Sequence, residues 1–160
     1  GMDAERALRY ATGAQGGLFS IFALVAVVLM LSPIARRVDR RGAFGLSLAG
    51  LACLAVSTAI LALGGALVTD SVAMVLYGLG FGLLFPAAAG MVGIAAPAPE
   101  RGRAYGIFNF SFDAGLAAGP LLAGALAVST LGVEPFVTAT VLIIVVAVLI
   151  PLAGRTRGIA

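Results

Sequence analysis

The sequence has no histidine, no lysine and a single cysteine. Without histidine or lysine, the chain can form no imidazole base, no histidine-ligated metal site, no lysine Schiff base and no GxxxxGK phosphate loop. The lone thiol, Cys53, can make neither an intrachain disulfide nor a paired-thiol metal site, and we expect it to act as a small apolar filler. Since no acid, nucleophile and base are clustered, we expect no enzyme, no metal and no cofactor.

The sequence also has few charged residues and many apolar ones. Of 160 residues, 61% are hydrophobic and 11% are charged, whereas about 25% are charged in ordinary soluble domains. A soluble domain of this size cannot bury so much apolar surface, because the buried fraction rises slowly with chain length. We therefore predict an all-α integral membrane protein whose surrounding partner is lipid.

The apolar segments predict five transmembrane helices, since about 20 apolar residues of helix cross a hydrocarbon core of roughly 30 Å. Only the fourth segment contains a charge. We expect residues 1–15 to form an external head, residues 16–154 the helix bundle and residues 155–160 a cytoplasmic tail. The predicted spans are residues 16–34, 43–67, 72–96, 104–128 and 136–153.

Arginine positions predict the orientation of these spans. The first loop, the third loop and the tail hold eight of the ten arginines, and the head holds the other two. Short loops rich in arginine stay in the cytoplasm, so these three segments should lie inside and the head outside. Arginines that follow membrane topology, without interleaved aromatics, argue against nucleic acid as a partner. An even number of spans is the commoner arrangement, so we expect at least one further helix before these five, or a longer chain of which they are a piece.

The third span contains GLGFG at residues 78–82. A dinucleotide-binding loop would need a third glycine, where the chain has Leu83, and a strand before it. Helix packing is the better interpretation, because Gly78, Gly82 and Pro86 fall on one side of a helix and let another backbone approach. Lining of a substrate path is the alternative.

The fourth span holds the single acid within the apolar segments, Asp113. Asn109 lies one turn before it and shares its face, while Ser111, Gly115 and Gly119 form a second line about 160° away at ~100° per residue. Asp113 should lie roughly 14 Å deep at ~1.5 Å per residue, where an unpaired carboxylate costs about 2.5 kcal/mol or more. Two interpretations stay open: an acid for proton coupling or substrate contact, and a structural bond to another helix.

Three segments resemble the major facilitator superfamily of transporters. PIARRVDRRGAF, after the first span, resembles the loop signature G-x-x-x-D-R-x-G-R-R in its incomplete, C-terminal form. YGLGFGLLFP and ERGRAYGIFNFSFDAGLAAGPLLAG resemble helices ten and eleven of the sugar and drug efflux branch, and the second contains an antiporter-like G-x-x-x-G-P-x-x-x-G pattern. The loop signature covers Asp39, Arg40, Arg41 and Gly42; the antiporter-like pattern is set by Gly115, Gly119, Pro120 and Gly124.

This resemblance implies helices eight to twelve of a bacterial inner-membrane transporter, a partial six-helix bundle whose partner is the missing half. Helices two to six of the N-terminal half are the alternative, because the halves are related repeats. It also implies alternating access with proton-coupled efflux of a small solute. Asp39 and the arginines beside it would form a cytoplasmic latch, a set of contacts that releases when the transporter changes state. Alternatively, these arginines only keep the loop in the cytoplasm during membrane insertion.

A membrane subunit that only assembles with other helices is the second functional hypothesis. The spans contain few polar groups and several phenylalanines, which favours amphipathic or hydrophobic solutes over hydroxylated sugars. The side chains considered as lining are Phe81, Phe85, Phe108, Phe110 and Phe112. Apart from Asp113, the polar groups are Ser57, Thr58, Tyr77, Asn109, Ser111, Thr138 and Thr140.

Overall fold

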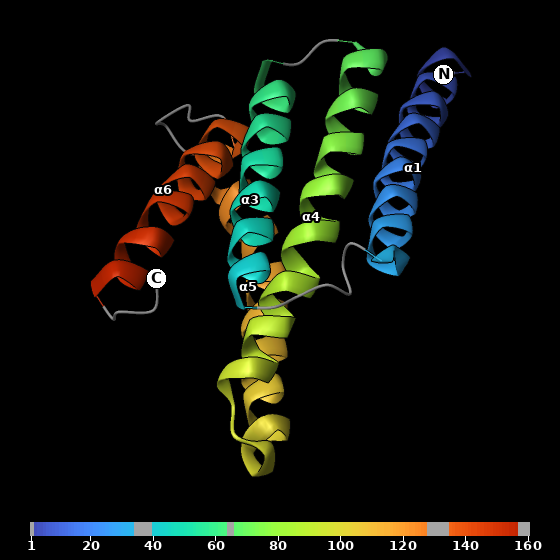
Figure 1. The fold of residues 1–160 in the computed structure, drawn as a ribbon. Coiled ribbons are helices and arrows are strands. Elements are labelled where there is room, and N and C mark those ends of the chain that lie inside the picture. The colour runs from blue at the N-terminus through green and yellow to red at the C-terminus, as the bar shows by residue number, and fades with distance from the viewer. Residues whose placement is uncertain (1, 34–39, 64–65, 128–134, 157–160) are drawn as a thin grey trace.

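The computed structural model describes residues 2–33, 40–63, 66–127 and 135–156, and all regular structure in these ranges is helical. The prediction of an all-α chain built from five long helices is confirmed. Figure 1 shows the elements, which are α1 (Met2–Leu31), α3 (Arg40–Leu63), α4 (Leu67–Ala95), the short 3-10 helix η1 (Ala98–Glu100), α5 (Arg101–Ala127) and α6 (Pro135–Thr156).

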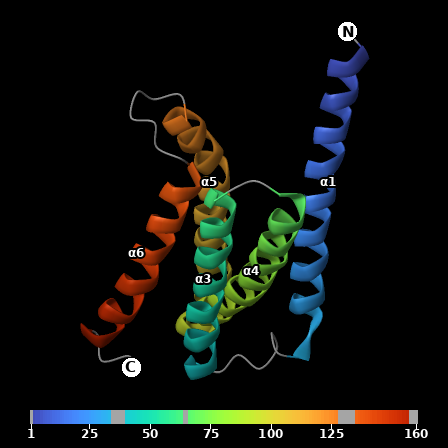
Figure 2. The same ribbon diagram turned by 90° about the horizontal axis from the view of Figure 1, so that it is seen from above.

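Helices α3 and α4 form the centre of the molecule. Helix α4 packs against both α1 and α3, and α6 packs on the other side of α3. Figures 1 and 2 show these four helices side by side, with α1 and α6 at the two ends and α5 on one face. The buried apolar side chains, which include Leu51, Leu54 and Ala73, come largely from α3 and α4. Helix α5, by contrast, makes few contacts with the other helices.

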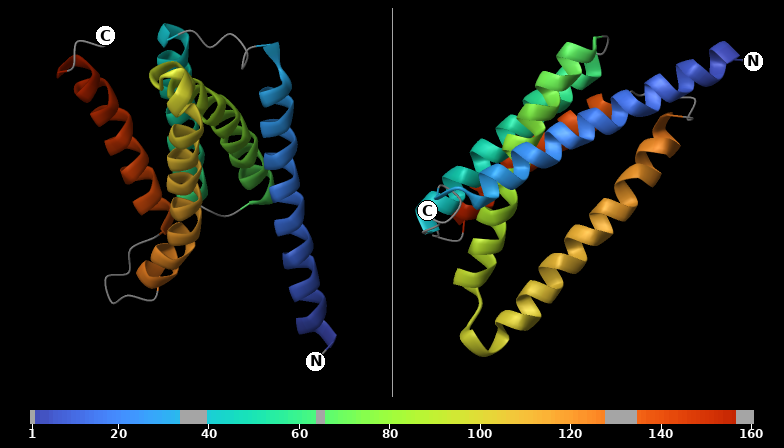
Figure 3. Two further views of the ribbon diagram at one scale, coloured as in Figure 1. Left: turned by 90° about the horizontal axis from the view of Figure 1, so that it is seen from below. Right: turned by 90° about the vertical axis from the view of Figure 1, so that its right-hand side faces the viewer.

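The chain reverses direction after α4, at Pro97. Ala96 adopts an extended conformation, φ −85° and ψ 130°, as expected for a residue that precedes proline. Its N–H still donates to the carbonyl oxygen of Val92, at 3.0 Å. The 3-10 turn η1 follows, and α5 then returns as the second arm of a hairpin (Figure 3).

Helix α5 touches α4 near this turn and then diverges from it (Figure 3). Phe108 and Phe112 of α5 contact Phe85 of α4, with ring centroids 5.7 and 5.2 Å apart. Further along α5, a Cβ atom placed on Gly115 or Gly119 would meet nothing within 4 Å. Most of the second half of α5 is therefore exposed within the described chain, where α5 contacts only α6 besides the hairpin.

Glycines allow the backbones of α1, α3 and α4 to come close. A Cβ atom on Gly78 would lie 2.8 Å from the carbonyl oxygen of Phe22, and one on Gly82 would lie 3.1 Å from that of Ala26. Both contacts join α4 to α1. A small side chain at these positions is thus required by the neighbouring backbone, which cannot move without separating the helices.

A second close approach joins α4 to α3 and involves Gly50 and Gly80. A Cβ atom on Gly80 would lie 2.8 Å from the carbonyl oxygen of Gly50, and one on Gly50 would lie 2.7 Å from that of Gly80. Because Gly80 lies about 200° around the helix from Gly78, α4 presents glycine on two nearly opposite sides.

We expect Gly80→Ala to lower the stability of the purified protein by about 1–3 kcal/mol, because the added methyl group would overpack against a backbone oxygen. Gly115→Ala is the matched control on α5. Its methyl group enters open space, so the change should be neutral or stabilising by about 0.5–1 kcal/mol through helix propensity. The stability of both variants is measured by the loss of helical circular dichroism during denaturation in detergent. Equal effects of the two substitutions would contradict the close contact between α3 and α4 at Gly80.

Hydroxyl groups connect α3 to both of its neighbours. The fully buried Ser57 hydroxyl donates to the carbonyl oxygen of Ala73 in α4, at 2.7 Å. Thr140 of α6 donates to the hydroxyl of Thr58, at 2.8 Å. Such interhelical bonds contribute about 0.6 kcal/mol each in membrane proteins, so they fix the register of the helices more than their stability.

Three helices are long and apolar enough to cross a membrane, judged by length and composition in the described residues: Gly13–Leu31, Gly42–Leu63 and Leu67–Ala95. The predicted spans at 104–128 and 136–153 coincide with α5 and α6, which do not meet that criterion. Polar and small residues lower the hydropathy of α5, and the apolar part of α6, Pro135–Pro151, is shorter. Membrane crossing by these two helices stays a prediction.

The helix boundaries also differ from the predicted spans at the beginning of the chain. Helix α1 starts at Met2, so residues 2–15 of the predicted external head belong to the same 30-residue helix as the first span. The external position of this segment stays a prediction. That segment, MDAERALRYATGAQ, contains four alanines and two arginines, which favour helix. Apolar length alone could not reveal this extension.

Candidate functional site

Asp113 lies near the middle of the 27-residue helix α5, and its side chain is exposed. It makes no hydrogen bond or ion pair with the residues that the structure describes. Asn109, one turn earlier, is exposed as well. The carboxylate and the amide are thus available to a molecule or helix that approaches this side of α5.

The face that carries Asp113 is distinct from the face that contacts α4. With ~100° per residue, Asn109 and Asp113 lie about 100° around α5 from Phe108 and Phe112, which touch α4. Gly115 falls on the same side of α5 as these phenylalanines, by the same count. The helix therefore presents its small residues along the α4 side, and its acid on the flank.

Six aromatic side chains from three helices form a continuous array, which we call the aromatic array. Phe22 of α1 contacts α4 through Tyr77 and Phe81, with centroid separations of 5.4 and 5.7 Å. Phe81 and Phe85 stack within α4 at 5.6 Å. Two rings of α5 complete the array. The centroid of Phe112 lies 6.0 Å from that of Phe81 and 5.2 Å from that of Phe85, and the centroid of Phe108 lies 5.7 Å from that of Phe85.

The aromatic array is only partly buried. All six of its side chains are half-buried, whereas the fully buried side chains in the described ranges are small, namely those of Ala43, Ser57, Ala73 and Ala87. Edge-to-face and offset pairs at such separations add about 0.5–1.5 kcal/mol each. The array consequently joins α1, α4 and α5 and still leaves aromatic surface open on them.

Phe110 was considered as a further lining residue, but it does not belong to the array. It is 75% exposed and lies on a different side of α5 from Phe108 and Phe112. Phe22, by contrast, was not singled out from the sequence. The spacing of Phe81 with Phe85 and of Phe108 with Phe112, four residues each, is a sequence signal for these pairs, while nothing in the sequence links them to α1.

Polar groups of the predicted substrate path lie elsewhere. Ser57, Thr58 and Thr140 face neighbouring helices and use their hydroxyl groups in the bonds described above. Ser111 is exposed, and its hydroxyl donates to the carbonyl oxygen of Ile107 on its own helix, at 2.8 Å. Asp113 and Asn109, near the middle of α5, are therefore exposed and make no hydrogen bond with the residues that the structure describes.

The loop signature after the first span falls largely outside the described residues. Asp39 lies outside them, and of Arg40 and Arg41 the structure describes only the backbone, at the start of α3. Gly42 is half-buried in the first turns of that helix. The latch hypothesis is accordingly a prediction for these four residues.

The residues predicted to pack helices occupy two different surroundings. Gly78 and Gly82 lie against α1, and Pro86 is half-buried inside α4, which continues through it. Gly115, Gly119 and Gly124 of α5 have nothing within 4 Å of an added Cβ atom, and Pro120 is exposed. Gly50 and Gly80, which make the closest approach between two backbones, are not among the predicted packing residues. The sequence signal for Gly80 is that GLGFG places alternate glycines on opposite sides of the helix.

The chain was compared with known proteins. The family model described as Major Facilitator Superfamily matches residues 6–157. No curated protein matches the sequence. Because the family model covers all but five residues at the beginning and three at the end, the chain belongs to the Major Facilitator Superfamily, a family of transporters.

Proposed function

We propose that this member of the superfamily forms part of a secondary active transporter, which moves a small amphipathic solute by alternating access and couples efflux to protons. The observation that carries the proposal is Asp113, an exposed carboxylate at mid-helix without a partner among the described residues. The family match supports transport, and the acid supports the coupling.

Asp113 is a suitable site for proton binding, because placing its charged form in the bilayer costs far more free energy than placing its neutral form. A charged carboxylate at the centre of a bilayer costs about 2.5–3.5 kcal/mol on insertion scales. No arginine lies between Gly42 and Ala95, so the apolar part of α3 and the whole of α4 offer no cation to offset this cost. In our proposal Asp113 is protonated in one access state and releases its proton, or binds solute, in the other, with Asn109 as a hydrogen-bonding neighbour.

The aromatic array supports an amphipathic solute. Its rings are half-buried on three helices, while the hydroxyl groups of Ser20, Ser71 and Ser111 on those helices each donate to a carbonyl oxygen of their own helix. Heavily hydroxylated solutes need many free donors and acceptors, whereas flat apolar solutes gain from aromatic surface.

We also propose that these helices correspond to helices eight to twelve of the sugar and drug efflux branch. The glycines of α5 that meet open space, Gly115, Gly119 and Gly124, would then receive a helix of the other half near Pro120. Asp39, Arg40 and Arg41, with Gly42 as the turn, would serve the latch on the cytoplasmic side of a bacterial inner membrane. Six or seven spans encoded upstream would support this choice, and spans encoded downstream would support helices two to six.

Transport in proteoliposomes tests the proposal. We expect the full-length protein to drive accumulation of ethidium, an amphipathic aromatic probe, when a pH gradient is imposed, and a protonophore to abolish that accumulation. Sucrose, a hydroxylated probe of similar size, should not accumulate. Movement of neither probe under any imposed gradient, with a correctly folded protein, would favour the assembly subunit instead.

A further inference from the structure

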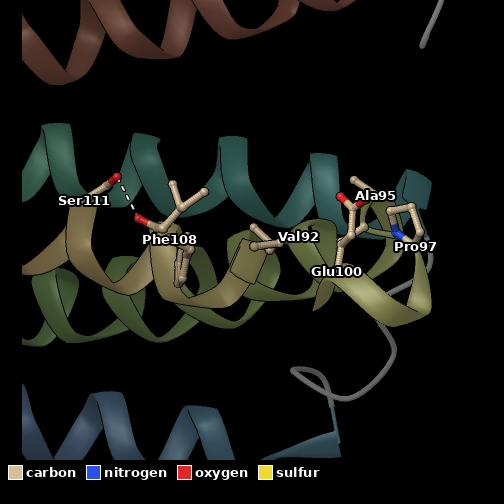
Figure 4. A pocket seen from close by; sticks show the side chains of 9 residues that line it. Val92, Ala95, Pro97, Glu100, Phe108 and Ser111 are labelled. Atoms are coloured by element: carbon tan, nitrogen blue, oxygen red, sulfur yellow. Dashed lines mark hydrogen bonds between the residues drawn. The ribbon is translucent and has the colours of Figure 1, made fainter. Parts of the chain in front are cut away.

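An open groove lies at the turn between α4 and α5, away from Asp113. Its volume is about 530 Å3, which is within the range of roughly 300–1,000 Å3 typical of small-molecule sites. Val92 and Ala95 of α4 form one wall, and Ile107 and Phe108 of α5 form the other. Figure 4 shows Glu100 and Pro97 at one end of this groove and Ser111 at the other. We call it the interfacial groove.

The groove extends from the end of the apolar helix α4 into the charged segment that follows it. The candidate span in α4 stops at Ala95, and the charged residues Glu100, Arg101 and Arg103 follow after a short turn. Apolar walls and charged side chains therefore meet within one site, as hydrocarbon and headgroups meet at the surface of a bilayer. The hydroxyl of Ser111, at the other end, is satisfied by its bond to the carbonyl oxygen of Ile107. Between the two ends the lining side chains are apolar.

A smaller hollow of about 220 Å3 adjoins the charged end of the groove. It is lined by Glu100, Arg103, Ala104 and Ile107, three of which also line the groove itself. Glu100 and Arg103 are both exposed, and neither makes an ion pair with a residue in the described ranges. A carboxylate and a guanidinium thus stand three residues apart beside an apolar channel.

This pair of opposite charges matches a zwitterionic headgroup. Arginine donates two parallel hydrogen bonds to phosphate oxygens, and a carboxylate accepts hydrogen bonds from a primary ammonium group. A phospholipid carries both groups on its headgroup, with an acyl chain that suits apolar walls. The quaternary ammonium of phosphatidylcholine has no N–H and cannot donate a hydrogen bond to the carboxylate. Phosphatidylglycerol has no amine and carries a net negative charge, which the carboxylate would repel.

We propose that the interfacial groove binds one aminophospholipid of the surrounding leaflet, with its phosphate on Arg103, its ammonium on Glu100 and the start of an acyl chain between α4 and α5. This site is separate from the proposed transport site and does not depend on proton coupling. The bound lipid would brace the α4–α5 hairpin at the turn, where α5 has its few contacts with α4.

Native mass spectrometry of the purified full-length protein tests the proposal. The protein is mixed with equal amounts of phosphatidylethanolamine, phosphatidylcholine and phosphatidylglycerol, and the retained lipid is counted. We expect phosphatidylethanolamine to be retained about tenfold over phosphatidylglycerol, the factor that ~1.4 kcal/mol produces, because a hydrogen bond to a charged group supplies at least that much.

Three variants and one control separate the parts of the site. Glu100→Gln should remove the preference for phosphatidylethanolamine, and Arg103→Gln should lower the retention of all three lipids. Ala104→Trp, which fills the groove, should lower retention and leave the preference unchanged. Arg101→Gln removes the same charge from a residue that lines neither hollow, so retention should match wild type.

Two outcomes would overturn the site. Equal retention of phosphatidylethanolamine and phosphatidylglycerol by the wild-type protein would remove the role of Glu100. An effect of Arg101→Gln as large as that of Arg103→Gln would show that surface charge in general, and not the groove, attracts lipid. Helical circular dichroism of each variant confirms that it is folded.

Discussion

Asp113→Asn is expected to abolish accumulation driven by a pH gradient in proteoliposomes. Each pH unit is worth ~1.36 kcal/mol per coupled proton, so a gradient of about 2 units supports up to about 100-fold accumulation. Asparagine is close in shape to aspartate and cannot take up or release a proton. The accumulation ratio should therefore fall from this ceiling to about one, while the helix content of the protein stays unchanged.

Exchange without a gradient separates coupling from solute binding. If Asp113 only carries the proton, the Asn variant should still exchange labelled solute for unlabelled solute across the vesicle membrane. If the carboxylate also holds the solute, exchange should be lost as well. Asp113→Glu, which keeps a titratable group, should retain gradient-driven accumulation in part.

A matched control is available at Asp70. This second acid lies in the first turn of α4, where the apolar segment begins. Asp70→Asn should leave the accumulation ratio at the wild-type level. A structural role of Asp113 would appear differently: Asp113→Asn would then lower thermal stability and transport together, and Asp113→Glu would not restore either.

Phe85→Ala is expected to destabilise the α4–α5 hairpin by about 2–4 kcal/mol. Phe85 makes three ring contacts, with Phe81, Phe108 and Phe112, and each aromatic pair contributes about 0.5–1.5 kcal/mol. Two of these contacts join α4 to α5, whose remaining contacts with its neighbours are few. Denaturation in detergent, followed by helical circular dichroism, measures the loss.

Phe110→Ala is the control for Phe85→Ala, because Phe110 is on the same hairpin but 75% exposed and outside the aromatic array. Its removal should change stability by less than about 0.5 kcal/mol, as for most surface substitutions. If both variants destabilised the protein equally, the aromatic array could not be what holds α5 against α4.

The glycines illustrate how far helical periodicity could predict packing. The spacing of Gly78 and Gly82 predicted one small-residue side on the third span, and the structure places a neighbouring helix there. The same reasoning assigned a packing side to Gly115 and Gly119, where the described chain has open space. Periodicity identifies residues that permit close approach, but it cannot identify the helix that approaches.

Apolar composition and helical spacing by themselves determined that the chain is all-α, where its five long helices lie and that Asp113 shares a face with Asn109. These are local properties, because they depend on residues within a few turns of each other. The tertiary structure alone decided which helices pair, that Gly50 meets Gly80, and that α5 leaves α4 beyond Phe112 so that Asp113 is exposed. Such contacts join residues far apart in the sequence, and their geometry depends on the shapes of both surfaces together.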